Sequence, residues 1–157
     1  MRIYLTGFMC SGKTTIGRLL AEKRNVPFVD LDQELEHSHS KTIVELFETK
    51  GEAYFRDQES RMLKRLEDHS CVIATGGGCF IQNREWMLRN GTVVYLDVPF
   101  DEIVRRIGGD PARPLWKNAE KLYMERSDEY RKAHFIVDAS GNPEDVVERI
   151  TTLPLPE

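Results

Sequence analysis

Five short runs rich in Val, Ile, Leu, Phe and Tyr are spread along the chain, and each has the length of a β-strand. Between them, apolar residues recur three and four positions apart, which is the spacing of amphipathic helices. The predicted strands are Arg2–Thr6, Pro27–Leu31, Cys71–Thr75, Thr92–Val98 and Phe135–Asp138, and the helical spacing is found in Ile16–Leu20, Ile43–Phe47, Met62–Leu66 and Ile103–Ile107. This alternation predicts an α/β fold in which a parallel sheet is covered by helices on both faces.

One segment interrupts this alternation. Gly108-Gly109-Asp110-Pro111-Ala112-Arg113-Pro114 contains two glycines and two prolines, which disfavour both helix and strand, and we interpret it as a mobile loop. Near the end of the chain, Asn142-Pro143-Glu144-Asp145 combines a capping residue with a proline suited to a first helical turn. It predicts a last helix that runs through Ile150.

The size and charge of the chain favour one domain, 1–157, that binds a small molecule. Its 157 residues are enough to bury a sizeable core. Lys and Arg number 22 and Asp and Glu number 26, a net charge of −4, and the two signs alternate along the chain. No broad basic surface is indicated, so we expect neither a nucleic acid nor a membrane as partner. An anionic ligand would need a local basic pocket.

The cysteines and the apolar runs indicate a protein of the cytoplasm. The three cysteines include no C-x-x-C pair, which disfavours a disulfide framework or a zinc site. No stretch has the length and apolar character of a signal peptide or a membrane span. We therefore expect a cytoplasmic protein with reduced thiols, and we expect it to be a monomer.

The strongest motif is Gly7-Phe8-Met9-Cys10-Ser11-Gly12-Lys13-Thr14, which fits G-x-x-x-x-G-K-[ST] between a predicted strand and a predicted helix. Backbone N–H groups of such a loop and the positive end of the helix bind phosphates. The lysine would reach the β- and γ-phosphates, and the Thr14 hydroxyl would bind Mg²⁺. The predicted nucleotide-binding residues are Cys10, Ser11, Gly12, Lys13, Thr14 and Thr15.

The nucleotide is expected to be ATP. A guanine-reading N-K-x-D segment is missing, because the sequence contains no Asn-Lys pair. The third predicted strand ends in Thr75-Gly76-Gly77-Gly78 and not in the acidic residues typical of motor ATPases. A small-molecule kinase is favoured.

Several other residues have two local interpretations. Asp32 is equally suited to cap a helix or to contact a ligand. Arg56 has Glu52, Asp57 and Glu59 nearby, and Arg126 has Glu125 and Glu129, so solvated ion pairs on helix faces are the default interpretation for both arginines. The three glycines form either a tight turn or a place where another group approaches the backbone.

Taken together, these segments resemble the shikimate kinase family over essentially the whole chain. The matching motifs are the phosphate loop, Phe28-Val29-Asp30-Leu31-Asp32, Gly51-Glu52-Ala53-Tyr54-Phe55-Arg56, Gly76-Gly77-Gly78, Arg113-Pro114-Leu115 and Arg126 with Tyr130. The resemblance implies a three-layer P-loop kinase fold with a five-stranded parallel sheet in the order 2-3-1-4-5 and a mobile lid. It also implies transfer of the ATP γ-phosphoryl group to the 3-hydroxyl of shikimate, in aromatic amino-acid biosynthesis.

The resemblance also implies roles for individual residues. Lys13, Asp32 and Arg113 would be catalytic, with Asp32 orienting the reacting hydroxyl and Arg113 brought in by closure of a lid at about 108–118. Shikimate would bind in a region at about 31–60. Its contacts would be Asp32, Arg56, Gly77 and Arg126, the two arginines holding its carboxylate. Asp30 would hold Mg²⁺ through water, and Arg106 and the loop 140–143 would flank adenine.

One departure from the family concerns Cys10, which stands where the family usually has glycine. We expect this position to adopt a backbone conformation open to residues with side chains. Its thiol is either reactive, because it lies near a helix N-terminus and Lys13, or packed against the body of the protein and inert. Two alternative functions stay open: a gluconate-type small-molecule kinase and a non-catalytic nucleotide-binding module.

Overall fold

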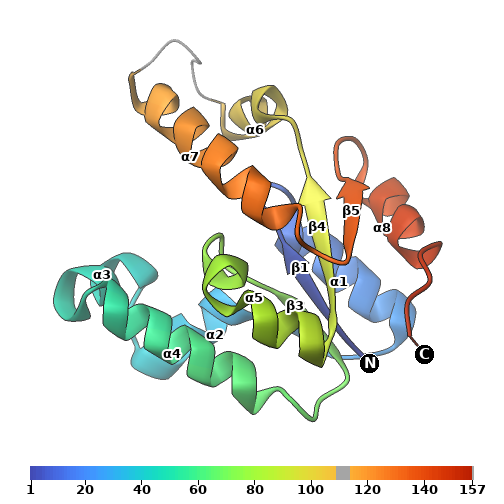
Figure 1. Cartoon of the computed structure of the whole chain (residues 1–157), viewed down its shortest axis with the longest axis horizontal. Helices are drawn as coiled ribbons and strands as arrows, with labels where there is room; N and C mark the ends of the chain where they lie inside the picture. The colour runs from blue at the N-terminus through green and yellow to red at the C-terminus, as the bar shows by residue number, and fades with distance from the viewer. Residues whose placement is uncertain (109–113, 157) are drawn as a thin grey trace.

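The computed structural model describes residues 1–108 and 114–156. In this part of the chain, one to three helices separate each strand from the next, as Figure 1 shows. In order, they are β1 (Arg2–Thr6), α1 (Lys13–Arg24), β2 (Phe28–Asp30), α2 (Leu31–His39), α3 (Ile43–Lys50), α4 (Glu52–Arg65), β3 (Cys71–Ala74), α5 (Cys79–Asn90), β4 (Thr92–Asp97), α6 (Phe100–Ile107), α7 (Pro114–Tyr130), β5 (Phe135–Asp138) and α8 (Pro143–Thr151).

The five strands form one parallel sheet in the order β2-β3-β1-β4-β5. The predicted fold class is confirmed, and each predicted strand is present. Four predicted ends were one residue too long. Strand β2 starts at Phe28 and stops at Asp30, because Leu31 already belongs to α2, and β3 and β4 stop one residue before their predicted ends. The sheet is parallel, so the carboxyl ends of β1, β2 and β3 lie at one edge, where ligands of such folds bind.

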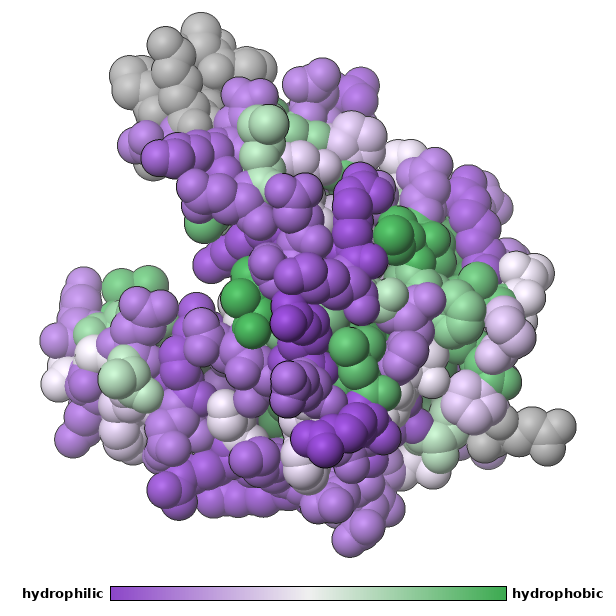
Figure 2. All heavy atoms as spheres, viewed as in Figure 1, coloured by the Kyte–Doolittle hydropathy of each residue, from purple (hydrophilic) through white to green (hydrophobic). Residues whose placement is uncertain are grey.

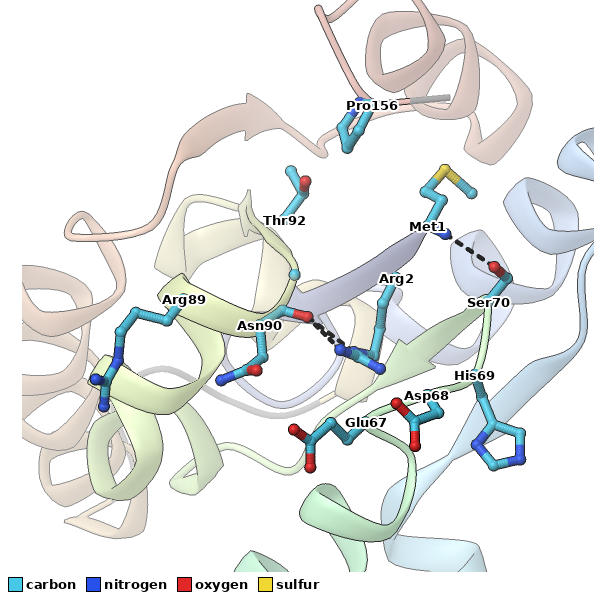
Figure 3. Close-up of a pocket in the computed structure, with 11 residues that line it drawn as sticks. Met1, Arg2, Glu67, Asp68, His69, Ser70, Arg89, Asn90, Thr92 and Pro156 are labelled. Atoms are coloured by element: carbon cyan, nitrogen blue, oxygen red, sulfur yellow. Dashed lines mark hydrogen bonds between the residues drawn. The ribbon is translucent and has the colours of Figure 1, made fainter.

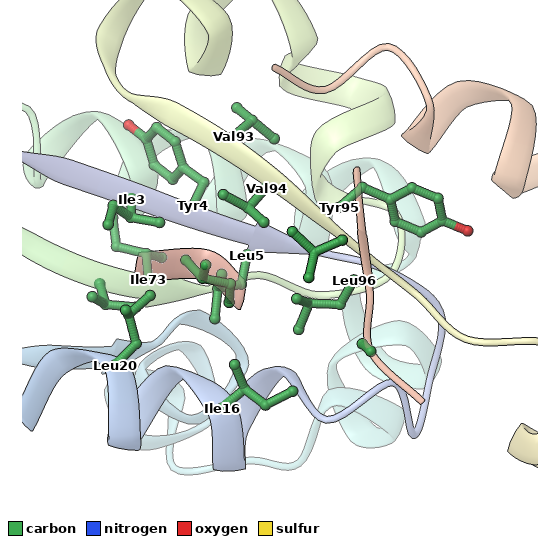
Figure 4. Packing of buried hydrophobic residues seen from close by; sticks show 14 of the residues in the cluster. Ile3, Tyr4, Leu5, Ile16, Leu20, Ile73, Val93, Val94, Tyr95 and Leu96 are labelled. Carbon is green, nitrogen blue, oxygen red and sulfur yellow. The ribbon is translucent and has the colours of Figure 1, made fainter. Parts of the chain in front are cut away.

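Side chains alternate between two buried layers of the sheet. Figure 4 shows Leu5 and Leu96 directed toward Ile16 and Leu20 of α1, whereas Tyr95 lies on the opposite side. Helices α1 and α8 pack together on the first face, and α5 and α7 pack together on the second. Most of β1, β3 and β4 is fully buried, as expected of a parallel sheet with helices on both faces.

A smaller apolar cluster lies beside the main core. It joins α2, α3 and α4 through Leu35, Leu46 and Phe55, with Phe47 packed against Phe55 at a ring distance of 4.8 Å. These three helices make one compact unit (Figure 1). The unit follows the carboxyl end of β2 and so starts at the edge of the sheet where ligands bind.

Helices α2, α5 and α7 were not predicted, and the prediction that the segment 108–114 contains no helix is wrong at Pro114. Helix α2 buries only Leu31 and Leu35, which is too few apolar positions for a clear helical spacing. In α5 the spacing is broken at Asn83, whose φ of −123° is not helical. Helix α7 starts at Pro114, inside the segment predicted to deny helix, because a first turn does not use the N–H that proline lacks.

The predicted lid at about 108–118 therefore includes the start of a helix. Gly108 ends α6 with a left-handed φ of 79°, and residues 114–118 form the beginning of α7. Residues 109–113, and with them Arg113, lie outside the described part of the chain. The expectation of a mobile lid is a prediction that these helix boundaries leave untested.

A hollow of about 400 Å³ lies at the opposite edge of the sheet, where the strands begin (Figure 3). Arg2 occupies it and donates to the main-chain oxygens of Leu66 and Asn90, the latter at 2.9 and 2.5 Å. These two oxygens lie at the ends of α4 and α5, where carbonyl groups lack helical partners. Arg2 therefore ties two helix ends to the first strand, and we assign this hollow a structural role.

The visible surface in Figure 2 is mostly hydrophilic, with separate apolar patches. Within residues 1–108 and 114–156, none of the helices combines the length and the apolar character needed to cross a membrane.

Gly17 tests the packing of α1 on the sheet. A Cβ at this position would lie 2.4 Å from Cε1 of Phe28 and 3.3 Å from Cδ1 of Leu5. Gly17→Ala should therefore destabilise the protein by about 1–3 kcal/mol, although the same exchange stabilises an open helix by about 1 kcal/mol. Chemical denaturation measures the change, with Glu22→Ala at an exposed position of α1 as control. A stabilised Gly17→Ala variant would contradict the packing described here.

Candidate active site

The loop between β1 and α1 makes a tight turn directly before the helix. Ser11 N donates to Phe8 O at 3.2 Å, and Gly12 precedes the helix with a left-handed φ of 97°. Among the described residues, no side chain caps this end of α1. Its first N–H groups and the positive end of the helix dipole are therefore available to an anion, which confirms the predicted geometry of the motif.

Cys10 differs from its expected conformation. Its φ of 59° is left-handed, so the expectation of a conformation open to residues with side chains is wrong. The loop keeps the shape that glycine adopts easily, at a cost of about 1–2 kcal/mol for an L-residue. The thiol is exposed and free, which excludes the interpretation that it is packed against the body of the protein.

Lys13 folds back into the loop in this structure. Its Nζ donates to Gly7 O at 2.5 Å and to Phe8 O at 3.2 Å. Removal from water lowers the pKa of Lys13 to about 8, and the nearby carboxylates of Asp32 and Asp30 oppose this shift. The ammonium group therefore lies where phosphates are expected, held by two carbonyl groups that are weaker partners for it than an anion would be.

Asp30, and not Asp32, caps α2. Its Oδ1 accepts from Gln33 N at 3.1 Å, which is the usual N-cap geometry. Its Oδ2 accepts from Thr14 Oγ1 at 2.9 Å. The capping interpretation of Asp32 is therefore wrong, and a carboxylate and a hydroxyl oxygen lie side by side next to the phosphate loop. Such hard oxygen donors suit Mg²⁺, which binds few protein groups and keeps waters and phosphates as its other ligands.

Asp32 points to the end of β3. A Cβ added to Gly76 would lie 2.8 Å from Asp32 Oδ1, and this oxygen is buried without a hydrogen-bond partner among the described residues. Burial raises the pKa of Asp32, and the neighbouring charge of Asp30 raises it further, while Lys13 opposes both. The carboxyl group is thus an unused acceptor beside the phosphate loop.

Arg56 lies against the same glycine run, from α4. A Cβ on Gly78 would be 2.5 Å from its NH2 atom. Its NH1 donates to Glu59 Oε1 at 3.1 Å, and its Nε lies 3.7 Å from Glu52 Oε1. The predicted ion pair of Arg56 with Glu59 therefore exists. The expectation that this pair is solvated is wrong, because Glu59 is fully buried.

Glu59 is a site residue that the sequence analysis missed. Burial raises the pKa of Glu59, and the adjacent Arg56 opposes the rise. One signal could have identified it. Phe55, Glu59 and Leu63 are the buried residues of α4, spaced four apart, so this glutamate occupies an apolar position of the helix.

Arg126 reaches the glycine run from α7. A Cβ on Gly77 would lie 2.6 Å from its NH1 atom. In the described residues, no carboxylate lies within 4 Å of its guanidinium, and Glu129 pairs instead with Arg84 at 2.9 Å and Lys132 at 3.1 Å. The predicted ion pair of Arg126 with Glu125 or Glu129 is therefore wrong, and its charge is available to a ligand.

These groups share one cavity of about 320 Å³ at the carboxyl edge of the sheet. It joins the phosphate loop, the ends of β2 and β3, and α7. Its lining residues are Met9, Cys10, Lys13, Thr14, Asp30, Asp32, Ala74, Thr75, Gly76, Gly77 and Arg126. Two cations and two carboxylates face a small polar space, which fits a compact anionic substrate with hydroxyl groups next to a nucleotide.

The remaining predicted residues lie around this cavity. Arg56 adjoins it behind Gly78, and Thr15 is exposed in the first turn of α1. Ser11 is buried in the loop, and its hydroxyl has no partner in the described part of the chain. Arg106 donates to Cys10 O at 2.8 Å and so reaches the phosphate loop from α6. Arg113 is the one predicted site residue outside the described residues.

Comparisons with known proteins agree on one family. A family model described as "Shikimate kinase" matches residues 9–153. A shikimate kinase of Persephonella marina is 44% identical over 156 residues, which is 94% of this chain and 95% of that protein. The crystal structure of a shikimate kinase from Aquifex aeolicus has a TM-score of 0.86 at 42% identity and covers 97% of this chain and 94% of its own.

A third similar structure contains a ligand. It is a shikimate kinase from Acinetobacter baumannii in complex with shikimate, with a TM-score of 0.86 and 36% identity. The match covers 96% of this chain and 90% of that one.

The exposure of Cys10 leads to a labelling prediction. Cys71 and Cys79 are buried, and burial raises the pKa of both thiols, whereas Cys10 is exposed in the phosphate loop. We expect an alkylating reagent to label Cys10 first and to inactivate the protein, and we expect MgATP to slow the labelling.

Timed alkylation followed by peptide mass mapping measures this order, and a Cys10→Gly variant is the control for inactivation. Equal labelling rates with and without MgATP, or faster labelling at a buried cysteine, would contradict it.

Proposed function

The chain belongs to the shikimate kinase family, and from this membership we propose how its residues divide the work of the reaction. The reaction is transfer of the γ-phosphoryl group of ATP to the 3-hydroxyl of shikimate, a step of aromatic amino-acid biosynthesis. The observation that carries the assignment is the family match over residues 9–153. It leaves no support for the gluconate-type kinase or the non-catalytic module.

Arg56 and Arg126 hold the carboxylate of shikimate. They come from α4 and α7, and their guanidinium groups lie against the consecutive residues Gly78 and Gly77. Planar guanidinium groups suit a carboxylate because each can donate two parallel hydrogen bonds. The shikimate bound to the Acinetobacter baumannii enzyme supports this proposal. A backbone N–H group at Gly77 contacts the substrate where a side chain would exclude it.

Glu59 holds Arg56 for this task. It is buried next to the arginine and accepts a hydrogen bond from NH1, which leaves NH2, the nitrogen nearest Gly78, to the substrate. A lone buried carboxylate would be costly, and so would a lone buried guanidinium, so each partner offsets part of the burial cost of the other while the pair orients the arginine.

Asp32 orients the reacting hydroxyl and accepts its proton. Its buried Oδ1 has no other partner in the described residues, and its raised pKa brings the carboxyl group closer to the range in which a base works at neutral pH. Phosphoryl transfer depends mostly on positioning and on charge, so alignment of the hydroxyl is the larger of the two contributions.

The phosphate loop binds ATP through Cys10, Ser11, Gly12, Lys13, Thr14 and Thr15. When ATP binds, the Lys13 ammonium exchanges the carbonyl groups of Gly7 and Phe8 for the β- and γ-phosphates. It then stabilises the charge that develops on the transferred group. Arg113 adds a second cation when the lid closes, and closure excludes water as a competing acceptor. Arg106 lies beside the adenine.

Thr14 and Asp30 fit a magnesium ion, Asp30 through a water molecule. Their oxygen atoms lie 2.9 Å apart at the edge of the cavity, and they match the oxygen ligands that Mg²⁺ prefers. When bound with ATP, the ion neutralises phosphate charge during the transfer.

The unit of α2, α3 and α4 contains the substrate region at about 31–60. We propose a monomer as the active form, with one domain and a lid at about 108–118. We also propose that the protein acts in the cytoplasm.

Asp32→Asn separates catalysis from nucleotide binding. The variant keeps the size and one acceptor but removes the charge, so kcat should fall by about 10²-fold or more while the Kd of MgATP stays within about twofold. Turnover and calorimetric binding of MgATP measure the two effects on the same protein. Glu34→Gln, an exposed carboxylate of α2, is the control. Weakened MgATP binding with a normal kcat would reassign Asp32 to the nucleotide.

The lowered pKa of Lys13 predicts proton uptake on ATP binding. With a pKa of about 8, much of the free lysine is neutral at pH 8.5, and bound phosphates favour the charged form. Lys13 should therefore take up protons when MgATP binds at pH 8.5. At pH 6.5 the lysine is already charged, so it should take up almost none.

Calorimetry in two buffers of different ionisation enthalpy measures this uptake. Lys13→Arg is the control, because arginine stays charged at both pH values. Equal binding heats in both buffers at pH 8.5 would show that the pKa of Lys13 is not lowered.

A further inference from the structure

Arg106 connects three segments that are far apart in the sequence. It lies in the last turn of α6 and donates from NH1 to Cys10 O at 2.8 Å and from NH2 to Ala139 O at 3.1 Å. Its Nε lies 3.4 Å from Glu102 Oε1, one turn earlier in the same helix. The guanidinium group thus joins the phosphate loop to the segment that follows β5, and Glu102 holds it in place.

The bond to Cys10 meets the loop at its most strained residue. Cys10 is left-handed at φ 59°, a conformation that glycine adopts freely and that costs an L-residue free energy. Its carbonyl group shares a peptide plane with the N–H of Ser11, which donates to Phe8 O at 3.2 Å. A charged donor on this carbonyl therefore fixes the plane and opposes a return of Cys10 to a relaxed conformation.

The second anchor of Arg106 is itself well supported. Ala139 is buried and follows the edge strand β5. Ser140 N donates to Asp138 Oδ1 at 3.0 Å, and Arg149 of α8 donates to Asp138 O at 2.8 Å. The segment is held at both sides of Ala139, so it gives the guanidinium a fixed support.

We propose that Arg106 is a positioning residue for the phosphate loop. By holding the Cys10 carbonyl, it keeps the loop in the wrapped form that binds the phosphate chain, a role separate from any contact with adenine. The proposal rests on the assignment of this loop to the phosphates of ATP.

Inorganic tripolyphosphate separates the two roles, because it has the charge of the phosphate chain and no base. If Arg106 positions the loop, Arg106→Ala should bind tripolyphosphate about tenfold more weakly than the unchanged protein. The adjacent Arg105→Ala is the matched control. Arg105 is 75% exposed, and in the described part of the chain it pairs with Glu102 alone. This variant should stay within about twofold.

A double-mutant cycle tests the link to the strained residue. In Cys10→Gly, the left-handed conformation is free of cost, so the loss caused by Arg106→Ala should shrink from about tenfold to about threefold or less. In steady-state kinetics, Arg106→Ala should raise the KM for MgATP and leave the KM for shikimate unchanged. Thermal melting of each variant verifies that it is folded.

Three outcomes would overturn the proposal. If Arg106→Ala weakens ATP but binds tripolyphosphate like the unchanged protein, the arginine contacts the base alone. If the loss is equally large with cysteine and with glycine at position 10, the bond does not support the strained conformation. If the unchanged protein does not bind tripolyphosphate at all, the assignment of the loop to phosphates fails, and the role of Arg106 fails with it.

Discussion

The candidate site depends on three consecutive residues without side chains at the end of β3. Asp32 approaches Gly76, Arg126 approaches Gly77 and Arg56 approaches Gly78, each within 2.8 Å of the place where a Cβ would be. A methyl group at any of the three would push one charged group away. The glycine run thus brings one carboxylate and two guanidinium groups, from α2, α7 and α4, to adjacent positions on one backbone segment.

Such a concentration of charge has a cost that the protein itself offsets only in part. Glu59 is buried beside Arg56 and offsets its charge inside the protein. Elsewhere the charges influence one another through the cavity: burial raises the pKa of Asp32 and lowers that of Lys13, and each of the two groups opposes the shift of the other. The free site is therefore held in an unfavourable electrostatic state, and in the function proposed above the carboxylate of shikimate and the phosphate chain of ATP relieve it.

The strands and the phosphate loop were predictable because their signals are local. A buried parallel strand is a short apolar run, and the loop motif combines glycines, a lysine and a threonine at fixed spacing between a strand and a helix. Helices α2 and α5 were missed because α2 has few buried residues and Asn83 interrupts the pattern of α5. The site residues beyond the loop were predicted only from the resemblance to the family, since their local surroundings favoured ion pairs or caps.

The sequence by itself therefore determined the α/β fold, the position of the phosphate loop and the family to which the chain belongs. The tertiary structure alone decided the state of each charged group. The spacing of Glu59 with Phe55 and Leu63 places it on the apolar face of α4, but only the packed structure shows that it is buried beside Arg56. Nothing near Arg126 in the sequence shows that Glu129 pairs with the distant Arg84. The left-handed Cys10 and its bond to Arg106 depend on residues 96 positions apart. Burial and pairing depend on what other elements bring to the same place, and a local pattern contains no information about those neighbours.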